Sequence, residues 1–208
     1  KKLPGHGAPA KPRENGIMSM FCFQCQETAK NTGCNMAGGM CGKKADTANL
    51  QDQLIQRLKM LALDFEKNGG NVKELGLFAL QSLFMTITNA NFDDGRIIAQ
   101  IAKADKMLAG KNVTAPCGVL STEDVNVRSL RELVTYGVKG IAAYGDHAAV
   151  LGFEDEEIYR YVLKALAAIT KNLTVDELIA LTLECGNVAV KTMALLDKAN
   201  TTTYGNPV

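Results

Sequence analysis

The sequence has no tryptophan, and aromatic residues make up only 6% of its 208 residues. Because 47% of the residues are hydrophobic, the chain can build one large core or two small ones, and those cores must be mainly aliphatic. Neither sign of charge is in excess, with 23 basic and 22 acidic residues. This balance gives no reason to expect a nucleic acid or an anionic membrane as a partner.

Long apolar runs are also missing. No uninterrupted run approaches the roughly 20 residues that a membrane-spanning helix needs. Residues 1–19 contain charges, prolines and glycines but not the apolar stretch of a secretory signal, so we interpret them as a tail or as vector-derived sequence. The sequence therefore predicts a cytoplasmic protein in a reducing compartment, where structural disulfides are rare.

Several catalytic motifs are absent as well. The sequence has no P-loop and no Gly-x-Ser-x-Gly motif, and it has only two histidines, His6 and His147. No second His or Cys lies at ligand spacing from His147, which favours a role at a helix end or in packing.

From residue 45 onward, apolar side chains recur at intervals of three and four, the period of an amphipathic helix. The alternation typical of a strand is not found. The stripes cover residues 50–65, 77–87, 97–108, 127–141, 158–169 and 178–196. We predict an all-α fold of two three-helix bundles, residues 45–111 and 121–199. A cysteine-rich loop over 20–44 precedes them and a loop over 200–208 follows.

Helix starts are marked by capping residues. Ser121 or Thr122 is expected to cap the fourth helix, and Thr174 with Glu177 has the form of a capping box at the start of the sixth. The acidic run at 154–157 opens the fifth helix, where negative charge complements the helix dipole. We prefer this interpretation to a metal site.

Four cysteines lie within twenty residues, Cys22, Cys25, Cys34 and Cys41, in the spacing Cys-x2-Cys-x8-Cys-x6-Cys. A Cys-x-x-Cys pair can reach one metal site from a tight turn. Glycines between the other thiols permit the positive φ values of a wrapping loop and let backbone N–H groups approach a cluster closely. The spacing predicts a metal centre.

Iron–sulfur and zinc sites remain alternatives from spacing alone. Iron–sulfur sites commonly group their cysteines in one short loop. A structural zinc site usually pairs two tight knuckles, whereas six residues separate the last two cysteines here. Disulfides or free thiols are a third, weaker interpretation.

Methionines and lysines surround these cysteines. The methionines are expected to shield a cluster from water, and they are Met18, Met20, Met36 and Met40. For the lysines, simple solvation competes with steering of an acidic redox partner or raising of a cluster's potential; they are Lys30, Lys43 and Lys44.

Seven stretches closely resemble the N-terminal domain of the hybrid cluster protein family, also called prismane proteins or hydroxylamine reductases. They are "MFCFQCQETAKNTGC", "GMCGK", "TANLQD", "TITNANFDD", "VRSLREL", "GVKGIAAYGDHAAVLG" and "MALLDKANTTTYGNP". The resemblance runs from about residue 20 to the end. It implies an all-α domain of two three-helix bundles whose cluster ligands match Cys22, Cys25, Cys34 and Cys41.

The resemblance also implies an oxidoreductase. The family reduces hydroxylamine to ammonia and water, and electrons enter at the N-terminal cluster from a ferredoxin or an NADH-dependent reductase. The eight-residue gap matches members with a [4Fe–4S] cluster. The six-residue gap resembles members with a [2Fe–2S] cluster, and we favour [4Fe–4S].

The family's catalytic site is a hybrid iron–sulfur–oxygen cluster held by later α/β domains. We expect those domains to be absent from this sequence and the chain alone to be inactive. Cys117 is expected to be an exposed loop thiol and Cys185 a small buried apolar residue, and neither is assigned to the catalytic site. The alternative function is a non-catalytic helical interaction module with a four-cysteine zinc site.

Overall fold

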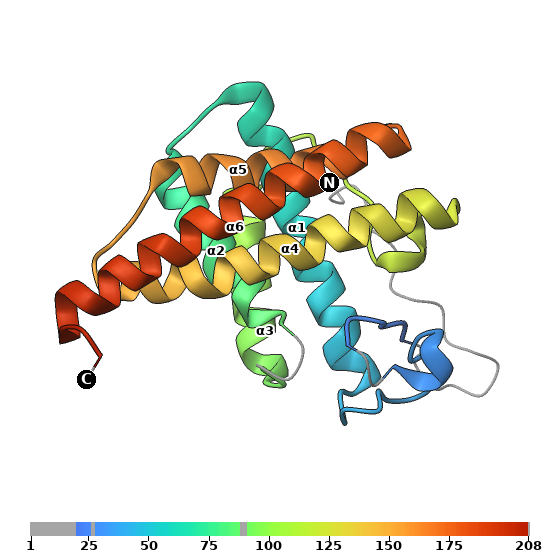
Figure 1. The fold of residues 1–208 in the computed structure, drawn as a ribbon. Helices are drawn as coiled ribbons and strands as arrows, with labels where there is room; N and C mark the ends of the chain where they lie inside the picture. The colour runs from blue at the N-terminus through green and yellow to red at the C-terminus, as the bar shows by residue number, and fades with distance from the viewer. Residues whose placement is uncertain (1–19, 26–27, 88–90, 208) are drawn as a thin grey trace.

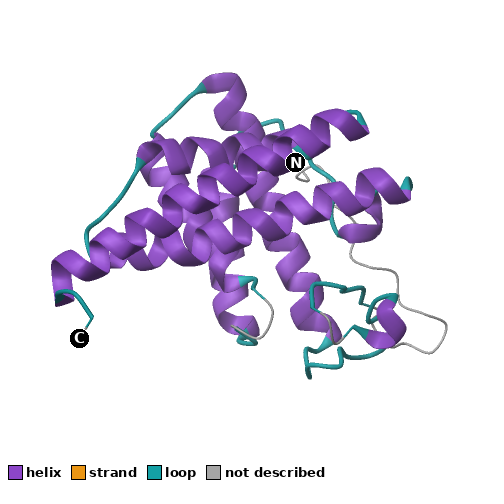
Figure 2. Cartoon of the chain, viewed as in Figure 1, coloured by secondary structure: helices purple, strands orange, loops and turns teal. Residues whose placement is uncertain are grey.

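The computed structural model describes residues 20–25, 28–87 and 91–207 (Figure 1). In this part of the chain there are six α-helices, two short 3-10 helices and no strand, which confirms the predicted all-α class (Figure 2). The α-helices are α1 (Ala45–Asn68), α2 (Val72–Met85), α3 (Asp94–Met107), α4 (Val125–Val150), α5 (Glu156–Ala168) and α6 (Val175–Tyr204). The 3-10 helices are η1 (Ala29–Asn31) and η2 (Val119–Ser121). The predicted tail at 1–19 lies outside the described residues.

The helices of the two predicted bundles share one core. The largest cluster of buried apolar side chains includes residues from all six α-helices. Helix α2 packs against both α4 and α5, and α1 packs against α3 and α5. The long helices α4 and α6 lie side by side across the molecule (Figure 1). The segment between α3 and α4 therefore does not separate two independent cores.

Small residues allow this close packing. A Cβ atom on Gly76 of α2 would lie 2.3 Å from the Cβ of Tyr159 in α5. A Cβ on Gly137 of α4 would lie 2.6 Å from the Sγ of Cys185 in α6. Cys185 is 4% exposed, which confirms its interpretation as a buried apolar residue. His147 packs edge-on against Phe84 with ring centroids 5.2 Å apart, so its predicted packing role is confirmed.

The helix starts differ in part from the prediction. Asp124 caps α4 by accepting a hydrogen bond from the Val127 N–H at 2.8 Å. Ser121 or Thr122 was the expected cap. That expectation is wrong because Ser121 ends η2 and donates its hydroxyl to the Gly118 carbonyl instead. The capping box of Thr174 and Glu177 is confirmed. The acidic run also behaves as expected, since its second residue caps α5 and the next two lie in the first turn.

Helix α6 is longer than predicted. The loop expected over 200–208 is helical as far as Tyr204, and only then does Gly205, with φ of 85°, end the helix. Threonines are weak helix formers, and for that reason the sequence suggested a loop. In the structure the Thr201 hydroxyl donates to the Asp197 carbonyl one turn earlier, at 2.8 Å, which keeps this polar group satisfied within the helix.

By length and composition alone, α6 is able to cross a membrane, with a mean hydropathy of 1.4 over its most apolar window. No uninterrupted apolar run in the sequence indicates a helix of this kind. Only 28% of that window is buried, although α6 packs along α4. Core helices of soluble proteins pass the same test, so the observation assigns no membrane role to the helix.

Candidate metal centre

The four predicted ligand cysteines line one small pocket at the start of the chain. Cys22 and Cys34 pair as an isolated antiparallel bridge, with N···O distances of 3.0 and 2.7 Å. A second bridge between Gly38 and Lys44 closes the loop just before α1. The loop folds back on itself beside the first turn of α1 (Figure 1). It thereby brings Cys25 and Cys41 to the same pocket as the other two cysteines.

Positive φ values make this fold of the loop possible. Gly33 has φ of 122° and Gly42 has φ of 87°, so the expected glycine conformations are present at these two positions and not at Gly38 or Gly39. A side chain at Gly33 is disfavoured by this φ and also by space, because a Cβ atom there would lie 2.7 Å from the Phe21 ring. Lys30 and Asn31 adopt positive φ without being glycine, which the sequence did not indicate.

Cys34 is the most buried of the four, at 5% exposed. Burial by itself raises the pKa of the Cys34 thiol, but hydrogen bonds from the backbone N–H groups of Met40 and Ala29 outweigh it. The Thr28 hydroxyl, 3.9 Å away, and the charge of Lys43 act in the same direction, so the net pKa is lowered. Because the thiolate is the form that binds metal, the loop prepares Cys34 as a ligand.

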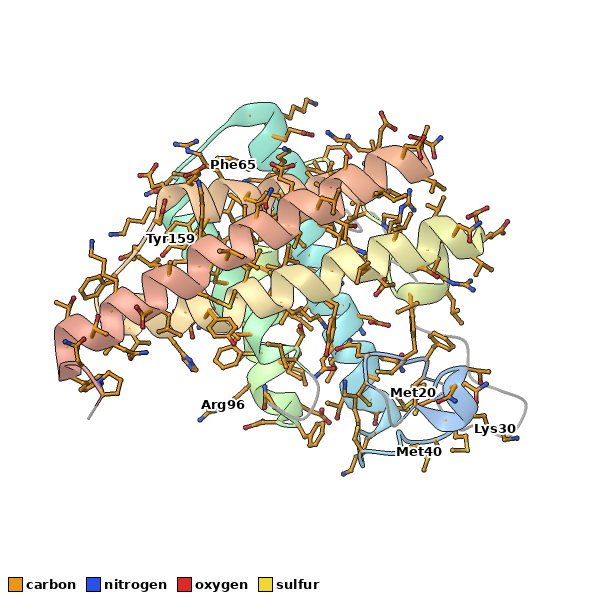
Figure 3. The ribbon with its side chains drawn as sticks, viewed as in Figure 1. Met20, Lys30, Met40, Phe65, Arg96 and Tyr159 are labelled. Carbon is orange, nitrogen blue, oxygen red and sulfur yellow. The ribbon has the colours of Figure 1, made fainter. Side chains whose placement is uncertain are left out.

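The lysines around the loop have different environments. Lys30 and Lys44 are exposed, and Lys30 lies at the outer edge of the loop (Figure 3). Lys43 is only 1% exposed and donates to Oε1 of Gln51 on α1 at 2.7 Å. Solvation is therefore the wrong interpretation for Lys43, whose charge is held inside the protein against the cysteine pocket.

The methionines also differ from one another. Met20 is 4% exposed and lines the pocket, as the shielding interpretation predicts. Met40, labelled in Figure 3, lines the pocket too, but it is 61% exposed. Met36 is 52% exposed. Met20 therefore shields the pocket from water, whereas Met36 and Met40 lie largely in solvent. Met18 lies outside the described residues.

A second cavity, of about 200 Å³, lies between the loop and α4. Phe23 and Gln24 form its loop side, and Glu132 and Lys139 are among the α4 residues on the other side. Lys139 is 2% exposed and donates to the Thr86 carbonyl at 3.2 Å. Sequence reasoning missed this lysine. The sequence feature that could have indicated it is that Lys139 is the one charged residue in the stretch 133–145 of α4.

Buried charges connect this cavity to the cysteine pocket. Burial raises the pKa of Asp52 to about 6, with the charge of Lys139 opposing the shift. Burial lowers the pKa of Lys139 to about 8, and the charge of Lys43 adds to the effect. Burial also raises the pKa of Glu132 and lowers that of Lys59. The helices thus hold cations and carboxyl groups next to the cysteine loop.

The remaining cysteines are separate from this site. Cys117 is exposed, as predicted, and desolvation with the nearby Asp52 charge raises its pKa. Burial raises the pKa of Cys185. Since a raised pKa leaves a thiol protonated, neither has the character of a metal ligand or a nucleophile.

The donor set of the loop fits an iron–sulfur cluster. Four thiols line one pocket, N–H groups reach a ligand sulfur, and the buried side chain of Lys43 lines the same pocket. The four cysteines line the pocket without three of their side chains meeting at the position of one metal ion, and no other His, Cys, Asp or Glu side chains do so within the described residues. A four-iron cluster takes one thiolate on each iron, so its ligands need not meet at a single point.

Comparison with known proteins places these features in a family. The sequence profile of the Prismane/CO dehydrogenase family matches residues 20–208. The chain is 51% identical over 229 residues to a hydroxylamine reductase of Nitratidesulfovibrio vulgaris, covering 90% of this chain and 40% of that protein. It is 46% identical to hydroxylamine reductases of Desulfitobacterium hafniense and Clostridium novyi, covering 91% of this chain and 41% and 40% of theirs. The chain thus spans about 40% of the length of these curated relatives.

Proposed function

The chain belongs to the Prismane/CO dehydrogenase family, and from this premise we propose that it is the iron–sulfur domain through which electrons enter a hydroxylamine reductase, or hybrid cluster protein. The observation that carries the proposal is that Cys22, Cys25, Cys34 and Cys41 line one pocket. The similarity to hydroxylamine reductases over 90% of the chain supports it.

These four cysteines would hold a [4Fe–4S] cluster, with [2Fe–2S] as the alternative. When bound, such a cluster supplies reversible one-electron transfer. The chain's own residues prepare the place for it. The bridge between Cys22 and Cys34 fixes two ligand backbones relative to each other, and N–H groups lower the pKa of Cys34. Met20 excludes water from one side, and Lys43 supplies positive charge.

The activity of the whole protein is a further proposal. Hydroxylamine takes up two electrons and two protons to give ammonia and water. The electrons would come from a one-electron donor such as a ferredoxin, or from an NADH-dependent reductase, in the cytoplasm. The family's hybrid cluster requires His, Glu and Cys ligands, and this chain spans about 40% of the length of the hydroxylamine reductases that it matches. We therefore expect this chain alone not to reduce hydroxylamine.

Iron and acid-labile sulfide analysis of anaerobically purified protein tests the cluster assignment. We expect about four iron atoms and four sulfides per chain. Cys25→Ser should lose most of this iron because a ligand is removed, whereas Cys117→Ser, the matched control outside the pocket, should keep it. One zinc per chain without sulfide would contradict the proposal and favour the helical interaction module with a zinc site.

A further inference from the structure

Lys139 lies deep between α4, α2 and the cysteine loop. Its ammonium group donates to the Thr86 carbonyl at the end of α2, and its side chain lines the cavity whose other wall is Phe23 and Gln24. Gln24 also lines the cysteine pocket, so the two cavities are neighbours separated by one loop residue. Lys139 therefore lines the cavity next to the pocket of the proposed ligands.

The charges that face Lys139 come from three elements. Lys43 of the loop repels it, while Asp52 of α1, Glu132 of α4 and Cys22 of the loop attract it. Cys22 is one of the four proposed ligands. The charge of Lys139, which is 2% exposed, and the charge at the cysteine site thus act on each other.

Among the residues that the structure describes, neither buried ammonium group is directly paired with a carboxylate, although the charges of Asp52 and Glu132 attract Lys139 at longer range. Lys43 donates to a neutral amide oxygen and Lys139 to a neutral carbonyl, and neither belongs to any of the described ion pairs. Burying a cation without a directly paired counter-charge is costly. Two such cations beside four thiols point to a negatively charged group at the cysteine site.

We propose that Lys139, together with Lys43, supplies buried positive charge beside the cluster and so raises the reduction potential of the cluster. The inference rests on the proposed function, because it takes the four cysteines to hold a cluster. Reduction adds one negative charge at the cysteine site. A buried cation stabilises that added charge more than an exposed one does, since solvent screens it less.

Redox titration of the cluster-loaded protein, followed by EPR, tests the inference. Lys139→Met removes the charge and keeps most of the side-chain volume. We expect the equilibrium constant for reduction to fall about tenfold, which for a one-electron couple is 59 mV. Lys164→Met removes an exposed lysine of α5 that pairs with Glu184 in α6, and this control should leave the potential unchanged.

Glu132→Gln provides a second variant with the opposite sign. It removes a negative charge from the same cavity wall and should raise the potential. Glu132→Gln also tests the inference if Lys139→Met does not fold or does not bind the cluster. An unchanged potential in Lys139→Met with wild-type iron content, or in Glu132→Gln if the first variant is unusable, would overturn the inference and leave the proposed function intact. A wild-type chain without iron or sulfide would instead overturn the proposed function itself.

Discussion

The cysteine loop and the helical body are stabilised in different ways. The body buries aliphatic side chains from six helices in one core. The loop contributes only a small cluster in which Met20 and Cys34 pack against Ala45 and Ala48 at the start of α1. Since burial of apolar area is the main source of folding free energy, the body has enough to fold without metal, whereas the loop has little. The loop is thus the region whose order should depend on its ligand.

The largest expected effect is in the body. Leu80 is fully buried and packs where Gly145 of α4 approaches α2. Leu80→Ala should lower the free energy of unfolding by about 2–5 kcal/mol, because it leaves a cavity in the shared core. Urea unfolding followed by circular dichroism measures this, with and without metal. Leu183 of α6 is 67% exposed, and Leu183→Ala is the control, which should leave the free energy of unfolding nearly unchanged. A loss in Leu80→Ala that appeared only in the metal-loaded protein would contradict the separation of body and loop.

The free energy of unfolding should depend on pH through Asp52 of α1. Its pKa is raised from 3.8 to about 6, so the charged carboxylate is less stable in the folded than in the unfolded chain. The contribution of Asp52 to the free energy of unfolding is therefore fully present below about pH 4. As the pH rises through about 6, this free energy falls by up to about 3 kcal/mol, because the buried carboxyl group must ionise.

Asp52→Asn should remove this loss. The variant should match the wild type near pH 4 and have a higher free energy of unfolding at pH 7, measured by urea titration at both values. Asp197→Asn, on the exposed side of α6, controls for the change in net charge. A lower stability of Asp52→Asn at pH 7 would mean that the carboxylate is needed to neutralise the buried lysines.

A substitution within the loop should affect the loop alone. Gly33→Ala places a side chain at φ of 122° and against the Phe21 ring, which costs about 1–3 kcal/mol. We expect lower iron retention and unchanged thermal unfolding of the helices. Gly186→Ala in α6, where a Cβ meets nothing within 4 Å, is the matched control and should be neutral or slightly stabilising. Equal iron retention in both variants would show that the loop does not need this conformation.

Much of the fold was predictable because local signals agreed with the helix period. The stripe positions and the capping box at Thr174 depend on residues close in sequence. The cap of α4 was missed because two hydroxyl residues and Asp124 are all acceptable caps, and only the turn of η2 selects among them. The extension of α6 to Tyr204 was missed because packing and hydroxyl hydrogen bonds outweighed weak helix propensity.

The candidate site divides in the same way. The cysteine cluster was found from spacing, since its four ligands lie within twenty residues. Lys139 was not found, because its relation to the loop arises only when α4 packs over residues more than a hundred positions earlier. Lys43 was found but its environment was not, since burial against Gln51 depends on how the loop meets α1. Tertiary contacts, not local pattern, determine these electrostatics.

The most direct test of the central claim is the EPR spectrum of the dithionite-reduced chain, purified without oxygen and integrated against its iron content. We predict an iron–sulfur signal amounting to about one unpaired spin per chain, lost in Cys34→Ser and retained in Cys185→Ser. A colourless protein that gives no signal and contains one zinc atom would contradict it.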